Sequence, residues 1–276
     1  DHIHILNDSG AEIVVVSTRR LAERVIAAAR QVDHVRAVIA IEEIEDADGV
    51  ALLRWRDVMA RGRTLPDDSR AYADALRRDD TACLIYTSGT GGRPKGVMLS
   101  HGALLCNCTG AWHLFTDGDL LRVDEEVFLS FLPLSHSYEH TGGQFFPMSI
   151  GAEIYYAEGV EHLVNNMAEA RPTIMTAVPR LYESMRARIE RGVEAAGGTK
   201  EKLFRKALAL GTKRYQDPNS LNFFERIQDA VLDKLVRAKV KARFGGRLKA
   251  LVSGGAPLNP EVGIYFTALG LRILQG

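Results

Sequence analysis

The sequence has few cysteines, few aromatic residues and no long apolar run. Its three cysteines, Cys83, Cys106 and Cys108, are an odd number without the paired spacing of a zinc site or a disulfide framework. We therefore expect buried, reduced thiols and a cytoplasmic protein. No stretch approaches the roughly 18 consecutive apolar residues of a membrane span. The first residues also lack the basic and then apolar pattern of a signal peptide.

The net charge is zero, but the charges are unevenly distributed. Residues 184–249 carry 17 Lys and Arg against 7 Asp and Glu, whereas residues 1–183 carry 17 against 27. Apolar residues recur in the basic segment at spacings of three and four, which predicts an amphipathic helix. They are Phe224, Ile227, Val231 and Leu235. This face is either a solvated helix surface or a basic surface that attracts anionic lipid headgroups or phosphate groups. Aromatic residues are only 7% of the chain and no recognition motif accompanies them, so we expect no nucleic-acid partner.

Helical and strand-like patterns alternate along the chain. Amphipathic helices are predicted around 21–32 and over 101–115. The strand-like runs are residues 13–16, 38–41, 82–85, 127–132, 153–156, 173–178 and 248–252. This alternation predicts an α/β fold with mostly parallel sheets flanked by helices. With 46% hydrophobic residues, the chain can bury one large core or two smaller ones.

Residues 86–96 are the most informative stretch. Hydroxyl residues, three glycines and Lys95 fall within nine positions, directly after the apolar run 82–85. We expect a buried strand that opens into a loop whose backbone N–H groups, hydroxyls and ammonium group bind an anion. The P-loop pattern does not fit, because Pro94 precedes the lysine and Gly96 follows it. The alternative is a glycine-rich surface loop that binds nothing.

Three motifs in order resemble those of the adenylate-forming ligases, the AMP-binding superfamily of acyl-CoA synthetases, luciferases and peptide-synthetase adenylation domains. Residues 86–96 resemble the phosphate-binding signature, with Gly91 where the family usually has threonine. Residues 131–140 resemble the second core motif, and residues 253–258 resemble the adenine-side loop. The resemblance implies the fold of the large N-terminal domain of acyl-CoA synthetase and luciferase-like enzymes.

The resemblance also implies roles for individual residues. Those expected to hold the phosphates of ATP are Thr87, Ser88, Gly89, Thr90, Gly91, Gly92 and Lys95. The Thr87 hydroxyl is also expected to face Mg²⁺. Those on the adenine side are Gly254, Gly255 and Ala256. His136, and more weakly His140, is expected beside the path of the carboxylate and the thioester.

A tunnel for an alkyl chain is the further expectation. Its candidate lining is Tyr138, Gly142, Gly143, Phe145, Val178 and Tyr182. The two glycines would leave room where a side chain would otherwise stand, and each buried methylene is worth about 0.8 kcal/mol. Core packing is the alternative for every member of the set.

The helical insertion over about 184–249 resembles the long-chain fatty-acyl-CoA ligases. It implies ATP-dependent conversion of a fatty acid to an acyl-adenylate and then to acyl-CoA, with Lys95 and His136 as catalytic residues. ATP, Mg²⁺ and coenzyme A are the implied cofactor and co-substrates. Ligases for aryl, amino or medium-chain acids, or a non-catalytic nucleotide- or lipid-binding module, remain alternatives. Peripheral membrane contact through the basic segment and a homodimer are left open.

The resemblance covers nearly the whole chain, whereas the chain corresponds to only the middle of such a ligase. The Tyr-Gly-x-Thr-Glu segment and the small C-terminal domain of the family are absent from residues 1–276. We therefore expect an incomplete large AMP-binding domain that is not fully active by itself.

Overall fold

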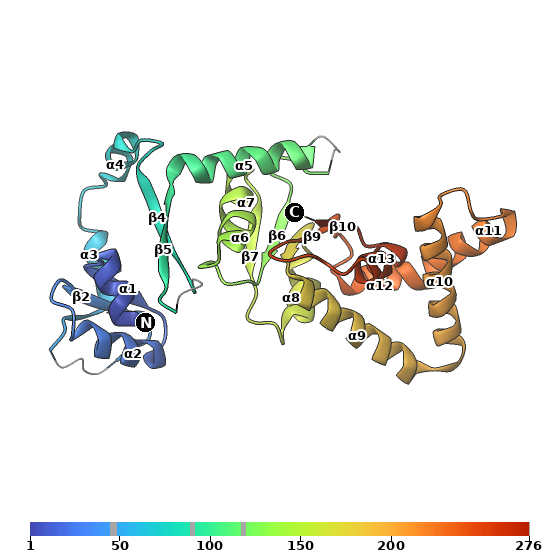
Figure 1. The fold of residues 1–276 in the computed structure, drawn as a ribbon, viewed down its shortest axis with the longest axis horizontal. Coiled ribbons are helices and arrows are strands. Elements are labelled where there is room, and N and C mark those ends of the chain that lie inside the picture. Colours follow the sequence, from blue (N-terminus) through green and yellow to red (C-terminus); the bar gives the residue numbers. More distant parts are fainter. Residues whose placement is uncertain (45–48, 89–91, 117–119, 276) are drawn as a thin grey trace. The chain divides into compact units, whose positions relative to one another are not determined.

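The structure, a computed structural model, describes residues 1–44, 49–88, 92–116 and 120–275 (Figure 1). The chain forms two compact units, Asp1–Leu105 and Cys106–Gly276. Each unit has its own sheets and its own hydrophobic clusters. The boundary falls within helix α5 (His101–Thr116).

The first unit holds a small parallel sheet of order β1-β2-β3. The elements of this unit before α5 are α1 (His2–Ser9), β1 (Ile13–Val16), α2 (Arg19–Ala29), β2 (Ala37–Ala40), β3 (Leu52–Arg54), α3 (Trp55–Gly62), α4 (Ser69–Ala75), β4 (Thr81–Thr87) and β5 (Lys95–Ser100). The central strand β2 is buried along its whole length. Helix α2 covers the sheet with Ala22 and Ile26, which pack on Val16 and Val38. The alternation predicted from the sequence is confirmed here.

Strands β4 and β5 form a separate antiparallel hairpin, in which Thr87 pairs with Lys95. The prediction of a buried strand over 82–85 is wrong, because Ile85 is its one buried residue and Leu84 is 38% exposed. Within the described residues β4 pairs with β5 alone, and a two-stranded ribbon cannot enclose both of its faces. Strand β5 was not predicted.

The second unit is built on a five-stranded parallel sheet of order β10-β9-β8-β6-β7. After α5 its elements are β6 (Val127–Ser130), α6 (Ser137–Glu139), the π-helix η1 (His140–Phe145), α7 (Phe146–Ser149), β7 (Glu153–Tyr156), α8 (Leu163–Ala170), β8 (Ile174–Ala177), α9 (Pro179–Ala196), α10 (Gly198–Gln216), α11 (Phe223–Leu232), the π-helix η2 (Asp233–Arg237), α12 (Ala238–Arg243), β9 (Ala250–Ser253), α13 (Pro260–Ala268) and β10 (Ile273–Gln275).

Helices cover both faces of this sheet, as parallel sheets require. Alternate residues of the strands point to opposite faces. Leu129, Met175 and Leu251 join the larger cluster with residues of α8, α9, α10 and α13. Phe128 and Ile174 join the other cluster with residues of α5 and α7. The predicted strands over 127–132, 173–178 and 248–252 are confirmed, with shorter or slightly shifted bounds.

The basic segment 184–249 is helical almost throughout, from within α9 to the end of α12. Within the residues that the structure describes, every helix is too short or too polar to cross a bilayer. The three cysteines lie in described parts of the chain and form no disulfide. Cys108 is buried, but Cys106 is exposed, so the expectation of buried thiols is wrong for that residue.

Candidate functional site: a phosphate hairpin and the carboxyl edge of the main sheet

The β4–β5 hairpin carries the candidate phosphate loop in the first unit. Thr87 ends β4, Ser88 follows it, and Lys95 begins β5 directly opposite Thr87. All three side chains are exposed. Lys95 has no ion pair to any described residue. The mouth of the hairpin therefore exposes two hydroxyls and one ammonium group.

Two contacts hold the base of this loop. The imidazole Nε2 of His4 donates to the Pro94 carbonyl at 2.8 Å, and the Tyr86 hydroxyl donates to the Asp8 carboxylate at 2.8 Å. The Tyr86 ring lies over Gly96, where a Cβ atom would come within 2.9 Å of Cζ. Burial, and next the hydrogen bond to Asp8, raise the pKa of Tyr86.

Gly92 has a φ of +88°, which is a left-handed conformation that favours glycine. With Thr87, Ser88 and Lys95 it makes up the described members of the set that was predicted to bind phosphate. Gly89, Thr90 and Gly91, which were also predicted to bind phosphate, lie outside the described residues.

The other predicted site residues belong to the second unit, where they follow three neighbouring strands. Tyr138 and its neighbours follow β6, Val178 follows β8, and Gly254 follows β9. Because β6, β8 and β9 are parallel and adjacent, their carboxyl ends share one edge of the sheet. In open α/β sheets this edge is where ligands bind. The structure thus brings together residues that are more than a hundred positions apart in the sequence.

His136 is exposed and is the N-cap of the short helix α6. Its Nδ1 accepts a hydrogen bond of 3.2 Å from the backbone N–H of Tyr138. Cap hydrogen bonds of this kind satisfy N–H groups that the first turn of a helix leaves without partners. The cap fixes the ring relative to the edge of the sheet. His140 begins η1, and its ring lies 4.7 Å from the ring of Phe145.

Glu139 is a central residue of this edge that the sequence did not reveal. Its carboxylate is fully buried and accepts hydrogen bonds from the Ser130 hydroxyl at 2.6 Å and the Thr176 hydroxyl at 2.7 Å. It thereby ties α6 to the ends of β6 and β8. Burial raises its pKa, against the opposing effect of these hydrogen bonds. Ser130 and Thr176 are 9 and 37 positions away, so no local pattern could identify the group.

Glu139 also explains why residue 143 in η1 is a glycine. A Cβ atom on Gly143 would lie 2.4 Å from Glu139 Oε1, and one on Gly142 would lie 3.1 Å from Thr176 Cγ2. The space beside Gly143 is thus filled by the carboxylate, whereas the sequence suggested room for an alkyl chain. That both residues contact the acid substrate stays a prediction.

Tyr138 joins the β6 and β9 sides of the edge. Its hydroxyl donates to the Val252 carbonyl at 2.9 Å, and a Cβ atom on Gly254 would lie 2.5 Å from its ring. Burial, and next the Glu139 carboxylate, raise the pKa of Tyr138 well above its usual range. Gly254 therefore has to be glycine because the tyrosine ring covers its backbone.

The remaining predicted residues differ in exposure. Gly255 has a φ of +80° and, with Ala256, is exposed. Val178 is half-buried and precedes Pro179, which opens helix α9. Tyr182 is fully buried, with its ring edge-on to Phe266 at 5.9 Å. Its position in the main core matches the packing alternative considered for the candidate tunnel residues.

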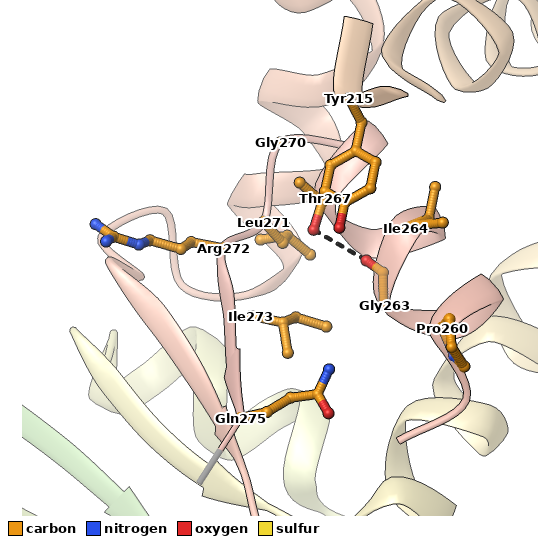
Figure 2. A pocket seen from close by; sticks show the side chains of 10 residues that line it. All are labelled: Tyr215, Pro260, Gly263, Ile264, Thr267, Gly270, Leu271, Arg272, Ile273 and Gln275. Carbon is orange, nitrogen blue, oxygen red and sulfur yellow. Dashed lines mark hydrogen bonds between the residues drawn. The ribbon is translucent and has the colours of Figure 1, made fainter. Parts of the chain in front are cut away.

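A hollow of about 420 Å³ lies elsewhere in the second unit, between α10, α13 and β10 (Figure 2). Its lining is Tyr215, Pro260, Gly263, Ile264, Thr267, Gly270, Leu271, Arg272, Ile273 and Gln275. Figure 2 shows the Thr267 hydroxyl bonded to the Gly263 carbonyl, and the Arg272 side chain extending away from the other lining side chains. No predicted site residue lines this hollow.

Comparisons with known proteins agree with this arrangement. The Arabidopsis thaliana protein "Long chain acyl-CoA synthetase 6, peroxisomal" is 32% identical over 86% of this chain and 32% of its own length. The Mycobacterium tuberculosis long-chain-fatty-acid–CoA ligase FadD15 is 31% identical over 99% of this chain and 44% of its own length. The chain therefore spans less than half the length of these curated relatives.

Solved structures show the same fold. The A-PCP didomain of a carboxylic acid reductase from Segniliparus rugosus, in complex with AMP, has a TM-score of 0.69 at 22% identity. The match covers 99% of this chain and 36% of that one. An adenylation domain of the same type of enzyme from Mycobacterium chelonae has a TM-score of 0.62 at 23% identity, with 99% and 40% covered.

The family comparison covers the entire sequence. Residues 1–276 match the family described as AMP-binding enzyme. The three motifs, the parallel sheet with its shared carboxyl edge, and these matches agree, and the chain belongs to the AMP-binding enzyme family.

Proposed function

We propose that this chain supplies the phosphate-binding and acid-binding parts of a long-chain fatty acid–CoA ligase. In this proposal the carboxylate of the fatty acid attacks the α-phosphorus of ATP, and pyrophosphate leaves. The thiol of coenzyme A then displaces AMP from the acyl-adenylate. The observation that carries the proposal is the hairpin mouth, where Thr87, Ser88 and Lys95 are exposed together.

The first half-reaction needs charge neutralisation above all. A carboxylate is a weak nucleophile that approaches a polyanion, so most of the barrier reduction comes from alignment and from positive charge at the phosphates. Lys95 supplies a mobile point charge, and the hydroxyls of Thr87 and Ser88 supply neutral donors. Gly92 keeps the backbone free to approach the phosphate oxygens.

Mg²⁺ fits this site as an ion carried by the nucleotide. Magnesium keeps several waters and is held largely by substrate phosphates, so a few protein ligands suffice. Thr87 offers one exposed hydroxyl at the end of β4. When bound, the ion would neutralise phosphate charge, and Thr87 is the residue in the described part of the chain that we propose as its ligand.

The second half-reaction is proposed for the carboxyl edge of the five-stranded sheet. His136 would line the approach of the thiol, and its cap hydrogen bond to Tyr138 supports a fixed orientation of the ring. Tyr138, Gly142, Gly143, Val178 and Tyr182 are proposed to lie along the acyl chain, and Gly254, Gly255 and Ala256 along adenine. The names of the curated relatives support a long alkyl substrate. The cytoplasmic location expected from the sequence stays a prediction.

Replacement of Lys95 tests the proposal directly. Loss of one charge-assisted contact costs about 1.5–3 kcal/mol, so Lys95→Ala should weaken ATP binding by roughly tenfold to over a hundredfold in titration calorimetry. Lys202→Ala removes an exposed lysine of α10 and should leave the affinity unchanged. In the full-length protein, palmitate-dependent pyrophosphate exchange should fall in Lys95→Ala, and a panel of aryl, amino and medium-chain acids identifies the substrate class. Equal ATP affinity in the parent protein and Lys95→Ala would refute the assignment.

A further inference from the structure

An apolar stripe is exposed on helix α11 and the π-helix η2, where the sequence had indicated a helix with one apolar face. We define the α11 stripe as Phe224, Ile227, Val231 and Leu235, whose side chains are 75%, 50%, 50% and 47% exposed. Phe223 adds a neighbouring ring at 5.8 Å that is 71% exposed. The face of α11 and η2 that is turned inward contains Asp229, Leu232, Val236 and Arg237 instead.

The stripe is held rigidly, because α11 is fastened to α10 through its inner side (Figure 1). A reciprocal cap between Asn222 and Glu225 starts the helix. Lys213 of α10 contacts Glu225 at 2.8 Å, and Arg214 contacts Asp229 at 2.5 Å. Glu225 and Asp229 of α11 thus anchor the helix to α10, and the residues of the α11 stripe are left outside.

The α11 stripe adjoins an apolar hollow of about 290 Å³ between α9, α10, η2 and α12. Leu235 is the stripe residue that also lines this hollow. Aliphatic side chains of the four helices and two phenylalanines form most of its lining. Its charged lining residues are Lys200, Lys239 and Arg243, all of them exposed cations, and no carboxylate lines it. These three cations have no ion pair to any described residue.

Most carboxylates of the surrounding segment already form ion pairs. Six of the seven acidic residues within 184–249 form ion pairs with cations of the same segment. They are Glu190, Glu194, Glu201, Glu225, Asp229 and Asp233. The excess positive charge is therefore available to an anionic partner.

We propose that the α11 stripe and the rim of this hollow form a docking surface for the interface of an anionic lipid bilayer. Phenylalanine and aliphatic side chains insert into the boundary between headgroups and acyl chains, while cations at their side contact lipid phosphates. The stems of Lys200 and Lys239 can lie along the apolar surface with their ammonium groups toward the headgroups. A second copy of the chain fits less well, because two positively charged faces would meet.

Vesicle flotation tests this surface without reference to ATP or turnover. We expect the protein to bind extruded vesicles that contain about one third phosphatidylglycerol, to bind phosphatidylcholine vesicles far more weakly, and to dissociate as salt is raised. Replacing all three rim cations, Lys200→Gln, Lys239→Gln and Arg243→Gln, should lower the partition coefficient on the order of 100-fold, about fivefold for each cation. Phe224→Ser with Ile227→Ser should lower it at least about tenfold.

Matched controls come from the exposed helices α3 and α4 and from Arg77, just after α4. Arg61→Gln, Arg70→Gln and Arg77→Gln remove three exposed cations, and Tyr72→Ser removes an apolar side chain that is 74% exposed, like Phe224. These variants should bind vesicles like the parent protein. The proposal is overturned if the parent does not bind phosphatidylglycerol vesicles, or if the stripe and rim variants bind as well as the controls. A concentration-dependent dimer that only the stripe variants abolish, without vesicle binding, would also overturn it and assign the surface to a second copy.

Discussion

At the scale of single residues, the contact between Gly143 and Glu139 makes a sharp prediction. Gly143→Ala places a methyl group 2.4 Å from Oε1 of Glu139, a carboxylate whose two oxygens each accept a hydrogen bond, from Ser130 and Thr176 respectively. Neither partner can move freely, so we expect the free energy of unfolding to fall by about 1–3 kcal/mol. Urea denaturation measures this change.

Gly110→Ala is the matched control, because nothing lies within 4 Å of the added Cβ atom in helix α5. Alanine is the better helix former, so this variant should be as stable as the parent or up to about 1 kcal/mol more stable. Equal losses in both variants would show that Glu139 does not enforce glycine at 143.

The buried Glu139 carboxyl makes stability depend on pH in a defined direction. Its pKa in the folded protein is raised by burial, so the folded state holds this proton at pH values where the unfolded chain has lost it. The contribution is therefore complete below the unfolded pKa of about 4.3 and is lost as pH rises through the folded pKa. Denaturant titrations at several pH values should show this loss in the parent and not in Glu139→Gln, whose side chain does not titrate. Parallel curves for the two proteins would contradict the assignment.

The positions and exposure of residues were predictable from the sequence where they depend on neighbours along the chain. The exposed hydroxyls and Lys95 of the hairpin mouth follow from a dense local motif. Glu139 was missed because its partners come from other strands. Gly143 was predicted to leave space for a ligand. In the folded chain the Glu139 carboxylate fills that space, and nothing in the sequence indicates this contact.

At the scale of elements, Arg237 fixes the packing of the basic helices. It is fully buried in η2, donates to the carbonyls of Ala207 and Ala268 at 2.8 Å, and contacts the Asp229 carboxylate at 2.6 Å. It therefore joins α10, α11 and α13 through one guanidinium group.

We expect Arg237→Ala to destabilise the protein by about 3–5 kcal/mol, because the carbonyls of Ala207 and Ala268 lose their donor and the buried Asp229 carboxylate keeps only Arg214, among the described residues, as an ion-pair partner. The double variant Arg237→Met with Asp229→Asn removes the leftover charge and should recover part of this loss. Lys239→Ala, an exposed cation of α12, should change stability by less than about 0.5 kcal/mol. Chemical denaturation of the three variants distinguishes these outcomes. If Arg237→Ala lowers the free energy of unfolding no more than Lys239→Ala does, the proposed role of Arg237 is wrong.

Strand prediction succeeded for the buried strands and also for the more exposed β1, β4 and β7, and it missed β5 of the hairpin. Strands β2, β6 and β8 are buried throughout and read as plain apolar runs. Strand β5 begins with Lys95 and Gly96, which look like loop residues, and its Met98 is 69% exposed. Periodicity cannot identify a strand whose apolar residues are not on one covered face.

At the scale of the whole molecule, the two units have separate cores, so their stabilities should be separable. The two tryptophans fall one in each unit, Trp55 in α3 and Trp112 in α5. In Trp112→Phe the remaining Trp55 fluorescence reports on the first unit. In Trp55→Phe the remaining Trp112 fluorescence reports on the second unit.

Leu251→Ala, in the larger core of the second unit, should cost about 2–5 kcal/mol. We expect it to shift the unfolding transition that Trp112 reports and to leave the transition that Trp55 reports in place. Ile26→Ala, in the core of the first unit, should do the reverse. A single transition that moves equally for both probes would show one cooperative unit.

The sequence was sufficient for the fold class, because alternation of strands and helices determines an α/β layer arrangement. It was not sufficient for the division after Leu105, since the boundary lies inside a continuous helix without any glycine- or proline-rich linker. The charge asymmetry was visible, but only the ion pairs show which charges are already neutralised.

The cap made by His136 restricts what that side chain can contribute to chemistry. Since Nδ1 is used as an acceptor, the neutral ring carries its hydrogen on Nε2, the nitrogen left for a substrate. That nitrogen has no lone pair to take a proton from a thiol. In the proposed function His136 would therefore serve as a donor to an oxygen or a thiolate, and a group other than His136 would deprotonate coenzyme A.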